Sequence, residues 1–315
     1  MSIAEINSGF CAKPLRKVFP NTASGHEQLL AWLASKGAQV VHAALEATGT
    51  WAEEAALALH QAGHRVSLLN PARIHAFART QMARTKTDKA DSLLITRFAQ
   101  MHQLEPWQPP AAEVRPLPAL VRRLESLEDM RLMEENRPGA GGLTASVRQL
   151  LQEHVEYLQA QCDKVKRQIK DHIDQNPGLK QQRDLLLSIP GVGEATAALL
   201  LAEVGPVERF EDARAVAAFA DLVPRIRQSG TSVRSRPRLS KVGSPRLRKA
   251  LYLPAMTALR FNPLVRALGL RPKEMGKPKM IIIGAAMRKL LHLAYGVLKS
   301  NTPFDPNFQS SALDG

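Results

Sequence analysis

The sequence predicts an α/β domain at the N-terminus, followed by a longer and mostly helical region. Two observations lead to this prediction. Short apolar runs alternate with amphipathic stretches over the first hundred residues or so, and long stretches of helical spacing follow a proline-rich linker. The 315 residues correspond to about two domains of roughly 150 residues each. Hydrophobic residues make up 44% of the chain, which is enough for a core and excludes global disorder.

The elements of the N-terminal domain follow from the spacing of the apolar residues. We expect helices over 26–36, 51–62 and 88–102, and buried strands over 39–45 and 65–69. Two strands that are joined by a helix form a parallel pair with a right-handed crossover. This order therefore indicates an α/β domain.

The proline-rich linker follows Leu104, and two long helices are expected after it, over 120–135 and 143–174. The glycine-rich segment 137–142 separates them, because it does not favour helix. In the second helix, apolar residues recur at steps of three and four, which is coiled-coil spacing: Val147, Leu151, Val155, Leu158, Cys162, Val165 and Ile169. An ordinary helical hairpin, packed on its own chain, explains this spacing equally well.

The rest of the chain is helical by pattern after the break at 176–178. Pro190-Gly191-Val192-Gly193 interrupts the helical stretch 185–201 and resembles the hairpin of helix-hairpin-helix modules. In such a hairpin, Gly191 and Gly193 would let backbone N–H groups approach a phosphate. A simple turn between two helices is the alternative. We thus expect three segments, which are 1–110, 111–178 and 179–315.

Positive charge is concentrated near the C-terminal end of a chain whose formal net charge is +14. Between Leu222 and Pro303 the sequence has 18 Lys and Arg residues and one acid, Glu274. A segment of unmixed sign favours a polyanion as partner, so nucleic acid is expected. Aromatic residues are sparse there, so phosphate contacts are expected more than base stacking. Nine of the basic residues fall within 25 positions: Arg225, Arg227, Arg234, Arg236, Arg238, Lys241, Arg246, Arg248 and Lys249.

The cysteine content and the lack of long apolar runs limit the class of protein. Cys11 and Cys162 are the two cysteines, which excludes a disulfide scaffold and is typical of a reducing cytoplasm. Cys162 is one of the regularly spaced apolar residues of the second long helix, which indicates a packed thiol. No apolar run approaches the ~20 residues of a membrane span, and the first residues do not resemble a secretory signal. We therefore expect a cytoplasmic protein with no membrane partner.

Three carboxylates in the α/β domain form a candidate metal site. Glu46 ends the first predicted strand, and Asp88 and Asp91 share one face at the start of a helix. Acids at a helix N-terminus are also explained by the helix dipole alone. Three hard oxygen ligands nevertheless suit Mg²⁺, with substrate phosphate and water completing its shell.

Several serines lie among the basic residues, and a serine hydroxyl becomes a nucleophile only beside a base or a metal. The residues alone do not choose among these serines: Ser229, Ser232, Ser235, Ser240 and Ser244.

Taken together, the motifs resemble the one-ten family of insertion-sequence transposases, which are DEDD transposases with a RuvC-like (RNase H-like) α/β domain. The resemblance runs from about Val18 to Phe304. Its marks, in chain order, are Phe19-Pro20-Asn21-Thr22 with Gly25-His26, Leu45-Glu46-Ala47-Thr48-Gly49-Thr50, Asn70-Pro71, Lys86-Thr87-Asp88-Lys89-Ala90-Asp91, Ile189-Pro190-Gly191-Val192-Gly193, Ala218-Phe219-Ala220, Ser229-Gly230-Thr231-Ser232-Val233-Arg234, Leu239-Ser240-Lys241, Arg248-Lys249-Ala250-Leu251-Tyr252 and Met287-Arg288-Lys289-Leu290.

The resemblance implies roles that the residues alone do not show. Glu46, Asp88 and Asp91 correspond to the second, third and fourth acids of the family's tetrad, which binds Mg²⁺. Ser229 corresponds to the nucleophile, which forms a covalent phosphoserine intermediate with DNA. The helical middle would serve assembly, from dimers to a tetramer. A structured bridge RNA would pair with donor and target DNA, in a prokaryotic cytoplasm and at the nucleoid when bound. The basic C-terminal segment would then recognise the backbone and the shape of the nucleic acid.

One departure from the family concerns its first acid, which lies on an N-terminal strand in a pattern like Gly-Ile-Asp. Here the chain begins Met1-Ser2-Ile3-Ala4-Glu5 and has no aspartate before Asp88. The expectation is that the first strand and much of the following hairpin are missing or replaced, with Glu5 at most a weak substitute. Three functions therefore remain open. They are an RNA-guided serine recombinase, a catalytically silent DNA- and RNA-binding derivative, and a metal-dependent junction nuclease that uses water.

Overall fold

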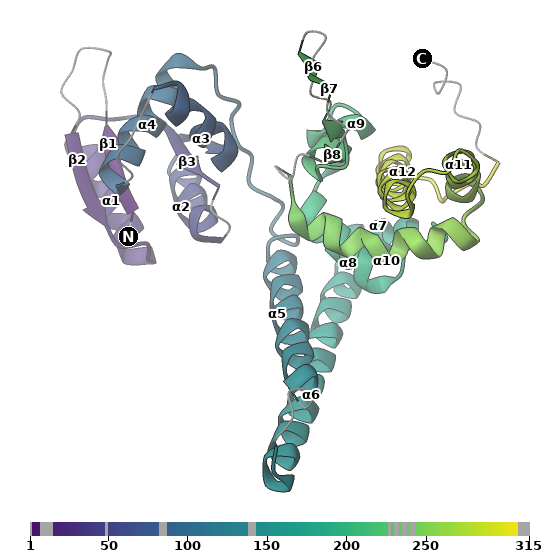
Figure 1. The fold of residues 1–315 in the computed structure, drawn as a ribbon. Helices are drawn as coiled ribbons and strands as arrows, with labels where there is room; N and C mark the ends of the chain where they lie inside the picture. The colour runs from purple at the N-terminus through teal and green to yellow at the C-terminus, as the bar shows by residue number, and fades with distance from the viewer. Residues whose placement is uncertain are drawn as a thin grey trace. The chain divides into compact units, whose positions relative to one another are not determined.

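The protein forms two compact units, Met1–Pro109 and Pro110–Gly315 (Figure 1). The computed structural model describes residues 2–6, 15–47, 50–81, 87–137, 143–225, 228–229, 233–234, 238–239 and 243–307. The first unit ends within a residue of the expected boundary at 110. The expected segments 111–178 and 179–315 lie in a single unit.

A parallel strand pair is the centre of the N-terminal unit. β3 (His42–Glu46) pairs with β4 (Arg65–Leu69), and Glu46 lies opposite Leu69 in the register. The crossover between them is α2 (Thr50–Gln61). The predicted strand–helix–strand order is thereby confirmed, with β3 beginning three residues later than expected.

Strand alternation divides the side chains of this pair between two helical layers. On one face, Ala43 and Leu45 of β3 pack against a cluster that joins β4 to α1 (Ala23–Ser35) and α2. On the other face, Ala44 packs against a cluster that joins Leu69 to α3 (Pro71–Thr80) and α4 (Asp88–Met101). The strand pair is therefore covered by helices on both faces.

The helix α3 was not expected from the sequence. Its N-cap is Asn70, whose Oδ1 accepts a hydrogen bond of 2.8 Å from Ala72 N, and Pro71 occupies the first helical position. An asparagine followed by proline is a turn signal, and it is equally an N-cap followed by the residue favoured at the start of a helix. Here the second of these alternatives holds.

An antiparallel strand pair is present at the N-terminus, so of the two expected alternatives, missing or replaced, the strands are not missing. β1 (Ser2–Ile6) pairs antiparallel with β2 (Leu15–Phe19), and Glu5 lies opposite Arg16 in the register. Within the described residues, the two strands pair with each other and not with β3 or β4. The sequence pattern missed them because the strands are short and polar residues interrupt the apolar ones.

In the C-terminal unit, α5 (Pro116–Asn136) and α6 (Ala145–Gln175) lie side by side as a long helical hairpin (Figure 1). Thr144 caps α6 by accepting a hydrogen bond from Val147 N. Four of the seven regularly spaced residues are buried in this chain's own core, in one cluster with Leu117, Val121, Leu124 and Leu127 of α5: Leu158, Cys162, Val165 and Ile169. The interpretation as a hairpin on its own chain is confirmed for these four residues.

The remaining helices surround the same core. They are α7 (Pro177–Leu187), α8 (Glu194–Val204), α9 (Ala213–Phe219), α10 (Pro245–Phe261), α11 (Pro263–Glu274) and α12 (Lys279–Ser300), with a short 3-10 turn at Val207–Arg209. Buried side chains of α5, α6, α8, α10 and α12 belong to one hydrophobic cluster. The helical middle and the C-terminal region thus share one core.

By length and composition, α12 reaches what a membrane span requires, which corrects the expectation that no apolar run does. Its residues Ala286, Met287, Leu290 and Leu291 lie in the hydrophobic core. A core helix passes the same test, so this helix is weak evidence for a membrane.

Four two-residue strands between α9 and α10 were not expected either. β5 (Pro224–Arg225) pairs with β8 (Arg238–Leu239), and β6 (Gln228–Ser229) pairs with β7 (Val233–Arg234), both antiparallel. In the sequence the inner pair lies between the strands of the outer pair, and these two nested strand pairs are together called the β-hairpin below. Figure 1 shows β6 and β7 extending away from β8 and α9.

Candidate active site and nucleic-acid interface

Glu46 is the last residue of β3, at the carboxyl end of the parallel pair. Since side chains alternate along a strand, Glu46 shares its face with Ala44, which packs against the cluster of α3 and α4. In open α/β sheets, ligands bind outside the carboxyl ends of the strands. Glu46 therefore lies at the usual edge for a site and on the side of the sheet that α4 covers.

The other two predicted acids lie in the first turn of α4. Thr87 caps this helix, and its Oγ1 accepts a hydrogen bond of 3.2 Å from Ala90 N. Asp88 is the first residue of α4, and its side chain lies outside the described residues. Asp91 is half-buried. The threonine of the predicted motif thus has a structural role, and it places the two aspartates at the positive end of the helix dipole.

The donor chemistry of this site fits a divalent cation, since Glu46 and Asp91 offer hard carboxylate oxygens. Within the described side chains, however, no group of three or more His, Cys, Asp and Glu lies close enough to hold a metal ion. Asp88 is not among those side chains. The structure therefore brings Glu46 and α4 to one face of the sheet and leaves the three-carboxylate site as a prediction.

Ser229 is the last residue of β6 and lies opposite Val233 in the register, and residues 230–232 lie outside the described residues. Its side chain lies outside the described residues, as do residues Ser232, Ser235 and Ser240 entirely. Ser244 has a different role, because its Oγ accepts a hydrogen bond of 3.3 Å from Leu247 N and caps α10. The structure thus places the backbone of Ser229 in β6 and gives Ser244 a structural role as the cap of α10.

The base of this hairpin is held by Arg248 of α10. Its Nη1 donates hydrogen bonds to the carbonyl oxygens of Ala220 (3.3 Å) and Gly243 (3.1 Å), which lie on opposite sides of the hairpin. The same nitrogen forms an ion pair of 3.3 Å with Asp221, whose side chain is 5% exposed. Arg248 therefore ties the chain entering the hairpin to the chain leaving it.

Close backbone packing completes this base. Gly243 has no room for a Cβ atom, which would lie 2.4 Å from the carbonyl oxygen of Phe219. That oxygen accepts a hydrogen bond of 3.0 Å from Ser244 N. Asp221 has a φ of +54°, a left-handed conformation that Asp tolerates better than most residues. Sequence patterns missed Asp221, because neither its burial nor its partner is encoded nearby.

The nine basic residues predicted to bind nucleic acid occupy three kinds of position. Arg227, Arg236 and Lys241 lie outside the described residues. On the hairpin strands lie Arg225, Arg234 and Arg238, and Arg225 is directly opposite Arg238 in the register. The remaining three lie on α10 and contact carboxylates of this chain: Arg246, Arg248 and Lys249.

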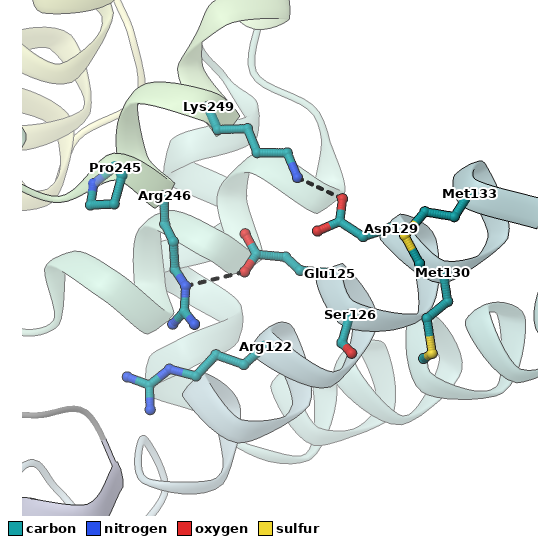
Figure 2. A pocket seen from close by; sticks show the side chains of 9 residues that line it. All are labelled: Arg122, Glu125, Ser126, Asp129, Met130, Met133, Pro245, Arg246 and Lys249. Carbon is teal, nitrogen blue, oxygen red and sulfur yellow. Dashed lines mark hydrogen bonds and ion pairs between the residues drawn. The ribbon is translucent and has the colours of Figure 1, made fainter. Parts of the chain in front are cut away.

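Figure 2 shows the groove of about 450 Å³ in which two of these pairs lie, between α5 and α10. Arg246 contacts Glu125 at 3.3 Å, and Lys249 contacts Asp129 at 2.8 Å. Burial raises the pKa of Glu125, against the opposing effect of Arg246. The hydrogen bond from Lys249 to Asp129 raises the pKa of the lysine. These pairs link the long helical hairpin to the helix that follows the β-hairpin.

The two glycines of the predicted phosphate-binding turn differ from each other. Gly191 has a φ of +105°, and a Cβ atom there would lie 2.8 Å from the Cβ of Ala258 in α10. Gly193 has open space at the same position. Buried Asn262, between α10 and α11, donates a hydrogen bond of 3.3 Å to the carbonyl oxygen of Pro190. Gly191 is therefore required by packing against α10, whatever else the turn binds.

The two parts of the chain match two family profiles. Residues 12–139 match the DEDD transposase profile of this family, and residues 183–269 match the profile described as "Transposase IS116/IS110/IS902 family". An α/β unit with an acidic strand end and a basic helical unit with a serine-bearing hairpin are thus the two halves of a transposase, an enzyme class that acts on DNA.

Similar proteins extend the match over nearly the whole chain. The pilin gene-inverting protein of Moraxella bovis is 33% identical over 290 residues, covering 91% of this chain and 89% of that protein. The protein of the same name from Moraxella lacunata is 32% identical over the same shares. The transposase for insertion sequence element IS1328 of Yersinia enterocolitica is 28% identical, over 61% of this chain and 64% of that protein. The chain belongs to the IS110 family of transposases.

Proposed function

We propose that this transposase cuts and rejoins donor and target DNA through a covalent bond between DNA and Ser229. The observation that carries the proposal is the position of Ser229 at the end of β6, in a segment whose two ends Arg248 ties together. The proteins named for pilin gene inversion support recombination as the reaction class.

The chemistry at Ser229 exchanges one phosphate ester bond for another. The serine oxygen forms a bond to phosphorus, and the bond from phosphorus to one deoxyribose oxygen breaks. The serine proton passes to a base, and the released sugar hydroxyl takes up a proton. The reverse reaction with a second DNA end rejoins the strands and frees the serine.

The basic hairpin would supply the electrostatics for this step. Arg225 and Arg238 lie opposite each other in the register, and like charges that face each other across a strand pair destabilise it. A phosphate between such residues removes the repulsion. The hairpin strands would therefore contact the DNA backbone next to Ser229, together with Arg227, Arg234, Arg236 and Lys241.

Glu46, Asp88 and Asp91 would hold a divalent cation such as Mg²⁺. When bound, that cation supplies charge stabilisation at the phosphate. Their backbone positions support this, because Glu46 and the first turn of α4 lie on one side of the sheet. Metal removal with a chelator should abolish cleavage while leaving part of the salt-dependent DNA binding.

Bridge-RNA guidance is the part of the proposal that rests on the family resemblance, together with an assembly of dimers or tetramers. The basic C-terminal unit would contact the RNA and DNA backbones, and sequence choice would come from base pairing.

The decisive experiment traps the covalent intermediate. Wild-type protein is incubated with nicked donor DNA, target DNA, bridge RNA and Mg²⁺, and the products are separated under denaturing conditions. We expect a protein–DNA adduct that disappears in Ser229→Ala and persists in the matched control Ser232→Ala. Cleavage that survives in Ser229→Ala would favour the water-dependent nuclease. Binding without cleavage in the wild type would favour the catalytically silent derivative.

A further inference from the structure

A second group of positive charges lies where α12 packs against the start of α9, and none of its members is among the nine basic residues above. Arg288, Lys289 and His292 lie on α12, and Arg214 lies in the first turn of α9. Arg288 and His292 are four residues apart, and Lys289 and His292 are three apart, so they neighbour each other on the helix surface.

The face of α12 that carries these residues is held against the segment before α9. Tyr295, one turn after His292, donates hydrogen bonds of 3.3 Å to the carbonyl oxygens of Phe210 and Glu211. This contact fixes the approach of the chain to α9. The charges of Arg288, Lys289 and Arg214 all act on the imidazole of His292.

Within the described residues, these cations have no carboxylate partner. Lys289 is half-buried, and burial alone lowers its pKa. No ion pair is formed by Arg214 or Arg288 in the described part of the chain. The acid nearby, Asp212, accepts a hydrogen bond of 2.7 Å from Ala215 N and caps α9.

His292 has an unfilled hydrogen-bonding position as well. Its Nε2 atom is buried and has no hydrogen-bond partner among the described residues. Burial, reinforced by Arg288, Lys289 and Arg214 and opposed by Asp212, lowers the pKa of His292 to about 4. The imidazole is therefore neutral at neutral pH, and one of its nitrogens lacks a partner in the free protein.

A half-buried ammonium without a counter-ion costs folding free energy, and so does a buried polar atom without a hydrogen bond. The first cost falls when an anion with several acceptor oxygens binds beside Lys289, and the charge of that anion also favours the protonated imidazole of His292. We propose that Arg214, Arg288, Lys289 and His292 form a binding site for a phosphodiester group of the nucleic-acid backbone. The site deepens the proposed function by adding a second backbone contact to that of the serine hairpin.

The test compares two lysines of the same helix. Lys289→Met removes the half-buried charge, and Lys299→Met removes an exposed charge from the last turn of α12 as the control. Dissociation constants for a short DNA duplex and for an RNA duplex of the same sequence are measured between about 50 and 200 mM salt. We expect Lys289→Met to weaken binding about tenfold at the lower salt and to reduce the salt slope by about 1. The duplex that shows this loss is the ligand.

Thermal unfolding separates a binding role from a structural one. Because Lys289 lacks a partner in the free protein, Lys289→Met should raise the Tm by about 2–4 °C while it weakens binding. The histidine gives a second readout. A bound phosphate favours the charged imidazole, so the NMR-measured pKa of His292 should rise on adding the duplex.

The outcomes distinguish this inference from the proposed function. If the wild type binds neither duplex, both are overturned. If the wild type binds and Lys289→Met has the same affinity and salt slope, the phosphodiester site is overturned and the serine mechanism stands. A lower Tm for Lys289→Met together with an unchanged His292 pKa on binding would also overturn the site.

Discussion

Arg246, Arg248 and Lys249 carry the same charge as the arginines of the β-hairpin, yet each contacts a carboxylate of its own chain. Lys249 and Asp129 are both largely exposed, and such a pair contributes less than about 1 kcal/mol. Arg248 and Asp221 are mostly buried, so each is costly to remove alone. Charge along the sequence thus identifies a basic region without separating residues that bind a ligand from residues that hold the fold.

Replacing Arg248 should loosen the hairpin that carries Ser229. Arg248→Ala removes the ion pair with buried Asp221, and breaking such a pair costs up to about 3–5 kcal/mol. It also frees the carbonyl oxygens of Ala220 and Gly243. We expect amide hydrogen exchange to accelerate over 222–242 and adduct formation at Ser229 to fall at least tenfold.

The control for this prediction is Lys249→Ala, which removes a neighbouring charge on α10 that is 67% exposed. It should leave exchange in the hairpin unchanged. Arg248→Lys should restore part of the adduct, because an ammonium keeps the charge but not the planar fork of donors. Equal exchange rates for Arg248→Ala and the wild type would contradict the role assigned to this residue.

The turn between α7 and α8 is the element whose geometry depends most on one glycine. In Gly191→Ala, the new methyl group meets Ala258 and the carbonyl oxygen of Pro254, and the φ of +105° is strained for alanine. We expect a loss of about 2–5 kcal/mol in the free energy of unfolding. Chemical denaturation followed by circular dichroism measures it.

Gly193→Ala is the matched comparison, since its φ of −107° suits any residue and its Cβ position is open. This substitution should change stability by less than about 1 kcal/mol. If it weakens nucleic-acid binding without loss of stability, the turn contacts phosphate as the sequence predicted. Equal stability losses in the two variants would refute the packing role of Gly191.

Elements with a regular apolar pattern could be predicted from the sequence, and elements without one could not. The strand over 65–69, the helix beginning at Asp88 and both helices of the long hairpin were expected within a few residues of their bounds. The β-hairpin was missed, because strands of two residues have no measurable alternation. Arg248 also holds its base through Ala220 and Asp221, which lie 28 and 27 residues away, and no local pattern encodes such contacts.

The residues of the candidate site also fall into those that a local sequence pattern predicts and those that it does not. Glu46 at a strand end and two aspartates at a helix start are local features, and their positions followed from the pattern. The left-handed backbone of Asp221 and the close approach at Gly243 depend on how α9 and α10 meet. Such features arise only once distant segments are packed together.

In the molecule as a whole, the end of the long helical hairpin leaves apolar side chains uncovered. Leu132 and Met133 of α5 are 53% and 59% exposed, and Leu150 and Tyr157 of α6 are 64% and 59% exposed. Val147, which belongs to the coiled-coil spacing and lies three residues before Leu150, is 39% exposed and is not part of the chain's own core. A second copy of the chain is the proposed partner of this surface.

Leu150→Glu should therefore shift the protein toward monomer without destabilising it. The side chain is exposed, so the substitution changes the stability of a single chain by about 0.5 kcal/mol or less. Analytical ultracentrifugation over a concentration series measures the change. Ala145→Glu, in the first turn of the same helix, introduces the same charge outside the apolar surface and should leave assembly unchanged. A wild-type protein that is monomeric at every concentration would exclude this interface.

Arg248 holds the base of the β-hairpin through two backbone carbonyl oxygens, and these are present whatever side chains the hairpin carries. The segment from 223 to 242 can consequently change in sequence and keep these two hydrogen bonds, whereas buried Leu222 belongs to the hydrophobic core. This attachment makes the segment exchangeable. A protein engineer can replace it with the corresponding segment of a relative, keeping Asp221, Gly243 and Arg248, and so alter the surface that is proposed to contact DNA.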